Sequence, residues 1–543
     1  MKFNHYFHKL KNQKSYVLNT TILFFLSLLF VVLFTFVDYG ISWDENIQNM
    51  YGNAIIKYYL SGFKNDSFLN FPSINHYGGF FDSIVAILNR MHPFGKMEAR
   101  HLFTALTGIL GIVGVYYLTR ILAGKTAGLI SAIMITLTPT YYGNMFMNPK
   151  DIPFAVGYVI SVYCILLVIN SFPKVPSKLV YWMGGFIGFA IGIRVGGFLL
   201  IGYMGLGILI YSLLLLWIKK YTFNFLFQRS SVIVLKSLLI SYMVLLLFWP
   251  YAQLNPIVNP FHSLFKMSNF YRDVYEIFEG NLIHPSNGGF PRYYLLKYFS
   301  INLPELVLIL GSFGLLFFVY RMYINFKTQK YKKSISLFIV TLSFGLPLVF
   351  FFLKNPPVYN GSRHFVFLVP IFVCMGGIVL YEILHFLYYK SKISFFIFIL
   401  TMAVYTGNHL RILWQIHPYQ YIYYNYFVGG LPGAFKKYEM DYWVVSYAEL
   451  IKKLVLYVKQ NDAEYSPNKR YSVSFCADPL TISYYLPKNF ELTIGTKADF
   501  LIYSDYQDIL ASNYKDCKVP KGGKKILTVE RFGVPLSYIK DLR

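Results

Sequence analysis

Long apolar runs separated by short basic loops are the feature that most constrains the fold of this chain. Eleven runs are candidates for membrane spans. A helix needs roughly 17 to 25 mostly apolar residues to cross the ~30 Å hydrocarbon core of a bilayer, and somewhat fewer where neighbouring helices cover it. In order, the runs cover residues 21–37, 102–118, 126–141, 152–172, 179–193, 195–218, 231–249, 303–319, 334–353, 365–387 and 393–406. The sequence therefore predicts a polytopic α-helical membrane protein with about eleven transmembrane helices.

The charges in the connecting segments predict the orientation of these helices. If the N-terminus is cytoplasmic, six segments fall on the cytoplasmic side, and each carries Lys or Arg but no Asp or Glu. These segments are residues 1–20, 119–125, 173–178, 219–230, 320–333 and 388–392. Cytoplasmic loops of membrane proteins are enriched in Lys and Arg. An error of one helix in the count would break the pattern, so the charges support eleven spans with the C-terminus outside.

Composition agrees with this fold class. The 543 residues are 56% hydrophobic and only 14% charged, which leaves too little polar surface for a soluble globular protein. The formal net charge is +25. Because the basic residues follow the predicted topology, we attribute this charge to membrane orientation, and we expect no nucleic-acid partner.

The acidic residues mark a second domain. Of 25 Asp and Glu residues, 13 lie in the last 136 residues. We therefore predict a transmembrane domain over residues 1–407 and an extracytoplasmic domain over residues 408–543. Helical spacing at 447–460 and short apolar stretches at 471–476, 492–494, 500–503 and 526–529 predict a small α/β fold for the second domain. The first extracytoplasmic loop, 38–101, contains amphipathic stretches at 47–59 and 80–91 that favour interfacial helices.

Two adjacent carboxylates, Asp44 and Glu45, follow the first span beside Trp43. A carboxylate partly removed from water is a plausible general base. The alternative is that both acids simply favour the N-terminus of the following helix.

Three further short segments place charges at the same predicted face. Lys150 and Asp151 lie between two prolines, and Arg363 and His364 precede the tenth span. An Arg at this depth suits a lipid phosphate, because its donor fork matches phosphate oxygens; contact with bulk lipid headgroups is the alternative. Arg194 lies between two spans and needs a partner, either an acid such as Asp151 or a ligand.

The order of these features resembles the GT-C superfamily of glycosyltransferases that use polyprenyl-phosphate sugars, over roughly residues 15 to 410. Within it, the chain is similar to glycosyltransferase family 39, which includes protein O-mannosyltransferases and the lipid A aminoarabinose transferase. The stretches that carry the resemblance are Asp44–Glu45, Ala99–Phe103, Asn148–Pro153 and Gly361–Phe365. The stretches 417–425 and 441–443 look like a feature of a bacterial subgroup, with no chemistry attached to them.

The resemblance implies an inverting transfer of a sugar from a polyprenyl-phosphate donor to a lipid, glycan or protein acceptor. In this scheme Asp44 is the base, Asp151 is the second acid, and Glu45 orients the acceptor or holds a divalent metal, whose requirement stays open. The groups that would bind the lipid phosphate are Lys150, Arg194, Arg363 and His364.

Two other functions stay open at this point. A transporter or lipid-carrier flippase would also be multispanning, but such proteins usually place their charged sites near the bilayer midplane. A non-catalytic scaffold is the third reading. Residue usage favours a bacterial inner membrane. Whether Cys476 and Cys517 form a disulfide is likewise open.

Overall fold

The computed structural model describes residues 2–91, 94–269, 275–284, 290–356, 358–475, 477–493, 498–504 and 522–543, with side chains from Tyr16 onward. Both cysteines of the pair considered above lie outside these ranges. Within them, Cys164 and Cys374 are free and buried.

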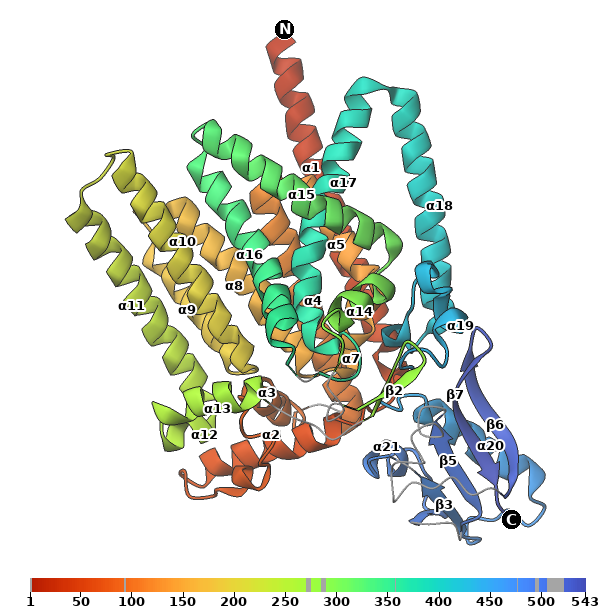
Figure 1. Cartoon of the computed structure of the whole chain (residues 1–543). Helices are drawn as coiled ribbons and strands as arrows, with labels where there is room; N and C mark the ends of the chain where they lie inside the picture. Colours follow the sequence, from red (N-terminus) through yellow and green to blue (C-terminus); the bar gives the residue numbers. More distant parts are fainter. Residues whose placement is uncertain are drawn as a thin grey trace.

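Helices occupy all eleven apolar runs (Figure 1). Among the described residues, nine helices are long and apolar enough to cross a membrane, and two, α5 and α9, are apolar but shorter. The helices are α1 (Lys2–Thr35), α4 (Lys96–Ala123), α5 (Lys125–Thr136), α8 (Asp151–Ser171), α9 (Ser177–Ile191), α10 (Phe198–Trp217), α11 (Phe223–Leu247), α15 (Glu305–Lys327), α16 (Tyr331–Lys354), α17 (Val369–Lys390) and α18 (Lys392–Ile416). The predicted polytopic helical fold is confirmed.

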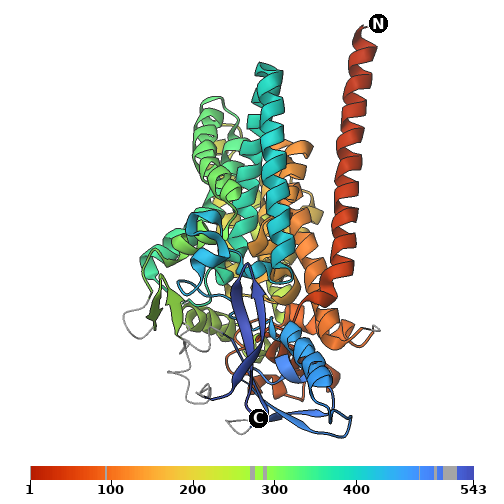
Figure 2. The ribbon, with the colours of Figure 1, turned by 90° about the vertical axis from the view of Figure 1, so that its right-hand side faces the viewer.

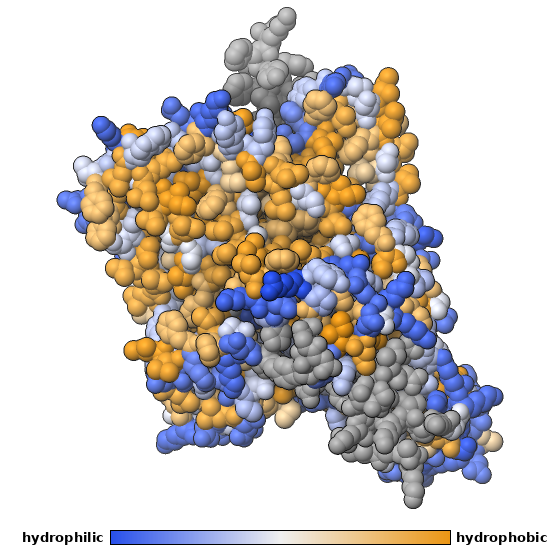
Figure 3. All heavy atoms as spheres, in the orientation of Figure 1, coloured by the Kyte–Doolittle hydropathy of each residue, from blue (hydrophilic) through white to orange (hydrophobic). Residues whose placement is uncertain are grey.

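Burial separates inner from outer helices. The apolar parts of α8 and of the span that contains α17 are 83% and 78% buried, whereas those of α1, α11 and α18 are at most 22% buried. The peripheral helices expose large apolar side chains such as Leu23, Leu235 and Phe396. Figure 3 shows an apolar band across this face of the bundle, between more polar ends. Outward apolar side chains of this kind suit contact with lipid.

Short elements gather at one end of the bundle (Figures 1 and 2). The first long loop forms α2 (Glu45–Leu60) and α3 (Phe80–Leu88), which match the two amphipathic stretches. Their position at a membrane interface stays a prediction. The other short elements include α6 (Pro139–Tyr142), α7 (Asn144–Met147), α12 (Pro250–Leu254), α13 (Val258–Ser268), α14 (Tyr294–Asn302), the strands β1 (Glu276–Phe278) and β2 (Asn281–Ile283), and the 3-10 helices η3 (Val195–Gly197) and η4 (Arg363–Leu368).

A five-stranded sheet lies at this same end, with strand order β4-β3-β5-β7-β6. The strands β3, β4 and β5 pair in parallel, and β7 pairs antiparallel with β5 and β6. The elements are α19 (Gly430–Ala434), α20 (Tyr447–Asn461), β3 (Tyr471–Phe475), α21 (Leu480–Ser483), β4 (Phe490–Thr493), β5 (Phe500–Ser504), β6 (Lys524–Arg531) and β7 (Val534–Asp541). A small α/β fold is thus present. Strand β7 was missed, and the division at residue 407 stays a prediction.

Candidate active site

The ends of four helical segments bring the candidate residues together at the end of the bundle that carries the sheet. Asp44 directly precedes α2, Asp151 begins α8, Arg194 precedes η3, and Arg363 begins η4. The Nη1 atom of Arg363 lies 2.8 Å from Oδ2 of Asp44. The Arg363 side chain is only 4% exposed, whereas that of Asp44 is 28% exposed. A ligand can therefore reach the carboxylate more easily than the guanidinium.

Two aromatic rings fix the Arg363 guanidinium. Its carbon lies 4.8 Å from the ring centre of Tyr359 and 5.1 Å from that of Trp443. Such contacts stabilise a cation and limit its orientation. Tyr359 belongs to the loop before η4, and Trp443 comes from the segment between α19 and α20. The sequence reasoning assigned no role to either residue.

Asp44 occupies the N-cap position of α2, but its side chain makes no capping hydrogen bond there. The carboxylate pairs with Arg363 instead. The helix-capping alternative therefore explains where Asp44 lies in the chain but not what its side chain does.

The loop before α8 is held by its own polar side chains. The Asn148 amide donates to Oδ2 of Asp151 at 2.9 Å, and the Asp151 backbone N–H donates back to Asn148 Oδ1 at 2.9 Å. The other Asp151 oxygen forms an ion pair with Arg194. This is the acid partner that the sequence offered for Arg194.

Lys150 lies among these charges. It is buried, and its ammonium group lies 4.1 Å from the ring centre of Tyr77. Burial lowers the pKa of Lys150 to about 8; the carboxylates of Asp82, Asp44 and Asp151 oppose this shift, and Arg194 adds to it. A lysine that titrates near neutral pH at a cluster of charges is typical of a functional site.

Glu45 points elsewhere. Its buried carboxylate accepts a hydrogen bond from the Ser42 backbone N–H at 2.7 Å, and Oε1 lies 3.1 Å from His101 Nε2. These contacts join the start of α2 to α4. Among the described residues, no group of three or more His, Cys, Asp or Glu side chains has the arrangement of a metal site. The contacts of Glu45 thus fit a structural role.

Two residues of the stretch Ala99–Phe103 also have structural contacts. Its Arg100 pairs with Asp82 of α3 at 3.2 Å, and both side chains are almost fully buried. Its His101 is the partner of Glu45. Two consecutive residues at the start of α4 therefore attach α3 and α2 to the bundle.

A large apolar groove reaches the charged cluster. It has a volume of about 1910 Å³, counting the space open to the outside, and its walls come mainly from α10, α16, α13 and the segment 358–367. Leu199, Leu206, Leu342 and Phe350 are among its apolar residues. Its polar lining includes Arg194, His364, Tyr77 and Tyr359. The groove therefore combines apolar walls with the Arg194 guanidinium and the His364 ring, an arrangement that suits an amphipathic ligand with an anionic head.

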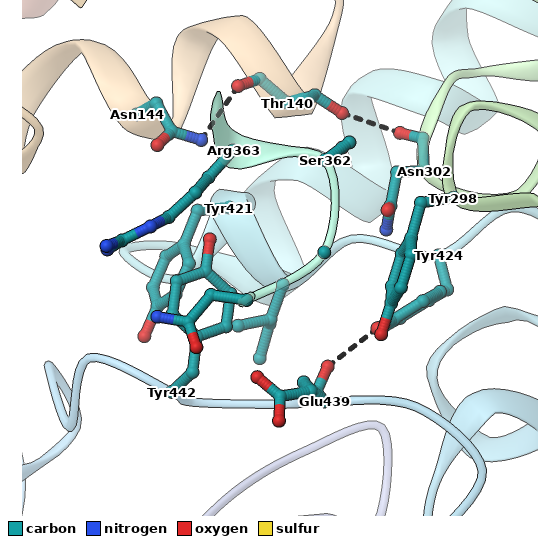
Figure 4. A pocket seen from close by; sticks show the side chains of 13 residues that line it. Thr140, Asn144, Tyr298, Asn302, Ser362, Arg363, Tyr421, Tyr424, Glu439 and Tyr442 are labelled. Carbon is teal, nitrogen blue, oxygen red and sulfur yellow. Dashed lines mark hydrogen bonds between the residues drawn. The ribbon is translucent and has the colours of Figure 1, made fainter. Parts of the chain in front are cut away.

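A second, smaller cavity lies beside Arg363 and is lined mainly by polar side chains (Figure 4). Its volume is about 350 Å³, again counting open space. Tyr421, Tyr424 and Tyr442 contribute to its wall, together with the buried Glu439. The stretches 417–425 and 441–443, to which the sequence attached no chemistry, thus help to form a polar pocket. Arg363 lines this pocket and His364 lines the groove, so consecutive residues face the two cavities.

The structure thus joins Asp44, Asp151, Lys150, Arg194 and Arg363 in one cluster with His364 nearby, and it separates Glu45 from them. Sequence reasoning missed Tyr77, Asp82, Tyr359 and Trp443. Single aromatic residues carry no signal in a chain that is 20% aromatic. Asp82 could have been noticed as an acid within an otherwise apolar helical stretch.

Comparison with known proteins gives one family match. Residues 83–252 match the family model described as dolichyl-phosphate-mannose-protein mannosyltransferase. This segment is less than a third of the chain and contains Asp151, Lys150 and Arg194. The match confirms the resemblance to the GT-C superfamily that the sequence motifs indicated. No curated protein matches the sequence.

Solved structures with a similar arrangement include ArnT from Cupriavidus metallidurans in the apo state, with 13% identity, a TM-score of 0.49, and coverage of 95% of this chain and 97% of ArnT. The same protein bound to undecaprenyl phosphate gives 13% identity and a TM-score of 0.47 over the same shares. The apo oligosaccharyltransferase of Archaeoglobus fulgidus gives 15% identity and a TM-score of 0.43. The match covers 83% of this chain but only 62% of the archaeal protein.

Proposed function

We propose that this chain is a membrane glycosyltransferase that moves a sugar from a polyprenyl-phosphate donor to an acceptor hydroxyl, with inversion at the anomeric carbon. The observation that carries the proposal is the apolar groove whose cationic lining lies next to the Asp44 cluster. A transferase for lipid-linked sugars needs both features, because its donor has an apolar tail and an anionic phosphate.

In this proposal, each part of the donor lies along a different part of the groove. The polyprenyl chain lies between α10 and α16, where the burial of apolar surface favours binding at roughly 25 cal/mol per Å². Its phosphate lies at Arg194 and His364, with the Lys150 ammonium nearby. Fixed cations in a site shielded from water stabilise the charge that develops on a leaving phosphate.

Asp44 is placed to act as the general base. In the transfer, the acceptor oxygen forms a bond to the anomeric carbon while the bond from that carbon to the phosphate oxygen breaks. The Asp44 carboxylate takes the acceptor proton, and the cations hold the released polyprenyl phosphate. Asp151, which is held by Arg194 and Asn148, keeps one of these cations in position.

We further propose that the site faces the extracytoplasmic side of a bacterial inner membrane. The basic, acid-free loops lie between α4 and α5, α8 and α9, α10 and α11, α15 and α16, and α17 and α18. The candidate site lies at the opposite ends of these helices. The positive-inside rule then places the basic loops in the cytoplasm and the site outside. In this arrangement residues 1–407 form the transmembrane domain, and residues 408–543 form a domain beside the site.

The experiment is a transfer assay with purified protein. A panel of radiolabelled polyprenyl-phosphate sugars is supplied with a membrane extract as acceptor source, and the release of carrier phosphate is measured for the wild type and for Asp44→Asn. We expect at least a ~100-fold loss, the usual size of a general-base effect. Asp38→Asn is the matched control. Asp38 is an acid at the end of the first span, shortly before Asp44, but its side chain is 46% exposed and pairs with His417.

The outcomes separate the alternatives. Wild-type turnover that is lost only in Asp44→Asn supports the proposal. Equal turnover of all three proteins would remove Asp44 from the mechanism. A wild type that moves the lipid carrier across vesicles without cleaving any donor would favour the transporter.

A further inference from the structure

Glu276 is a fully buried carboxylate outside the cluster described above. It begins β1 and is 1% exposed. The Tyr298 hydroxyl donates to its Oε1 at 3.1 Å, and the Tyr294 hydroxyl donates to the same atom. Two backbone donors complete the set: the N–H of Asn360 lies 3.1 Å from Oε2, and that of Gly361 lies 3.2 Å from Oε1. Four donors thus converge on one buried acid.

The backbone held by Glu276 precedes Arg363, with Ser362 between them. Asn360 and Gly361 both have positive φ angles, 57° and 66°. This left-handed conformation costs free energy for a residue with a side chain and persists only where the surroundings impose it. A Cβ atom on Gly361 would lie only 3.1 Å from Tyr298 Cε1. The loop therefore depends on a close fit against α14 and on the Glu276 carboxylate.

The hairpin that carries Glu276 is also attached to residues 437 and 438. Gly280, in the turn after β1, donates its N–H to the Lys437 carbonyl at 3.0 Å. Phe278 forms a bridge with Tyr438. The hairpin thus links the segment before α20 to the loop before η4.

We propose that Glu276 is a positioning residue for the transfer reaction, because its carboxylate holds residues 360 and 361 so that the Arg363 guanidinium meets Asp44. This inference rests on the proposed function for its effect on turnover. The claim that Glu276 attaches the loop can be tested without measuring turnover.

The charge state of Glu276 gives the test a distinctive signature. Burial raises the pKa of Glu276 to about 7, although the hydrogen bonds from Tyr294, Gly361, Tyr298 and Asn360 lower it in part. Among the other titratable groups near this site, Glu439 acts on Tyr294 and Tyr298, Tyr424 acts on Tyr298, and the Tyr438 ring packs against Tyr298. Arg363 follows on the loop itself. Hydrogen bonds to an ionised acceptor are roughly twice as strong as neutral ones, so the loop is held less firmly as the pH falls through about 7.

The effect of pH on global stability has the opposite sign to its effect on the loop. Because folding raises this pKa, the folded chain binds the proton more tightly than the unfolded chain does. The contribution of Glu276 to stability therefore increases as the pH falls from about 7 toward 4.5. A loss of turnover in this window without a loss of stability points to the loop rather than to unfolding.

The test compares Glu276→Gln and Glu276→Asp with Glu279→Gln. Glu279 is the matched control because it lies in the same hairpin, pairs with Lys297 at 2.9 Å and is about one third exposed. Hydrogen exchange of the backbone amides in residues 358–364 is measured together with turnover from pH 6 to 8. Glu276→Gln should exchange about 10-fold faster at residues 360 and 361, lose turnover and lose the pH dependence near 7. Glu276→Asp should recover part of the slow exchange and part of the turnover. Glu279→Gln should match the wild type in both measurements.

Unchanged exchange in Glu276→Gln would overturn the proposal, as would faster exchange with full turnover. A wild type without turnover would refute the proposed function. In that case the exchange measurement still decides whether Glu276 holds the loop.

Discussion

Asp44 and Arg363 are 319 residues apart in the sequence, yet they form a partly buried ion pair in which Arg363 Nη1 lies 2.8 Å from Asp44 Oδ2. Trp443, a further 80 residues along the chain, stacks on the same guanidinium. The candidate base is therefore positioned by three separate segments: the first loop, the loop before η4, and the segment before α20. The C-terminal part of the chain thus contributes to the site itself.

Arg363→Lys should lower turnover by about 10- to 100-fold, although the positive charge is kept. A lysine lacks the planar fork that pairs with a carboxylate and stacks between two rings. The assay is donor turnover at saturating donor. Arg411→Lys is the control, because Arg411 is an exposed residue of α18 whose side chain donates a hydrogen bond to Asn408, far along the chain from the cluster. Equal activity of both variants would show that Asp44 does not need the guanidinium.

Gly202→Phe should block the groove and raise the KM for the donor. Gly202 lines the groove, and a Cβ atom added there meets no other atom within 4 Å, so the ring would fill open space rather than disturb packing. Gly185→Phe in α9 is matched to it, since a Cβ at Gly185 is equally unobstructed and that residue is not among those lining the groove. Binding of undecaprenyl phosphate to both variants gives the comparison. Similar affinities would mean that the lipid tail lies elsewhere.

The affinity for polyprenyl phosphate should fall as the pH rises through about 8. Because burial lowers the pKa of Lys150 to about 8, its ammonium is protonated below this pH and loses its charge above it. The phosphate, with a second pKa of about 6, stays ionised throughout this range. The affinity for polyprenyl phosphate is measured at a series of pH values between 7 and 9.5. In Lys150→Arg this pH dependence should disappear, because a guanidinium keeps its proton; its persistence would exclude Lys150 as the titrating group.

Arg100→Leu should destabilise the protein by ~3–5 kcal/mol, because it removes the cation that is hydrogen-bonded to the buried Asp82 carboxylate and leaves only the charge of Lys150 acting on it. Thermal unfolding in detergent measures this, and addition of Asp82→Asn should recover part of the loss. The exposed pair of Lys297 and Glu279 provides the contrast, since Lys297→Gln should cost at most ~1 kcal/mol. A small effect of Arg100→Leu alone would mean that Lys150 or water compensates the Asp82 charge without the guanidinium.

The sequence predicted the helices well because their signal is local. Each apolar run had to become a helix in lipid, where every backbone polar group needs an internal partner. Even the short runs that became α5 and α9 were found in this way. Strand β7 was missed because its pattern, Val534–Asp541, mixes apolar and charged residues, and its place in the sheet depends on pairing with β5 and β6.

The candidate site was predicted only in part. The sequence identified Asp44, Asp151, Lys150, Arg194 and Arg363 as charges at helix ends on one predicted face, since unpaired charges near a membrane need a partner or a function. It placed Glu45 in the same site as Asp44, with the role of orienting the acceptor or holding a metal. Adjacent residues at the start of a helix point in different directions, and only the fold shows that one meets Arg363 and the other meets His101.

Hydropathy and charge along the chain thus determined the class of fold, the helix positions and the residues available for chemistry, because these depend on each segment's own contact with lipid or water. The tertiary structure decided which charges pair, that an apolar groove reaches them, that Trp443 packs on Arg363, and that Glu276 accepts hydrogen bonds from residues 360 and 361. Those relationships join residues tens to hundreds of positions apart, and no local pattern encodes such distances.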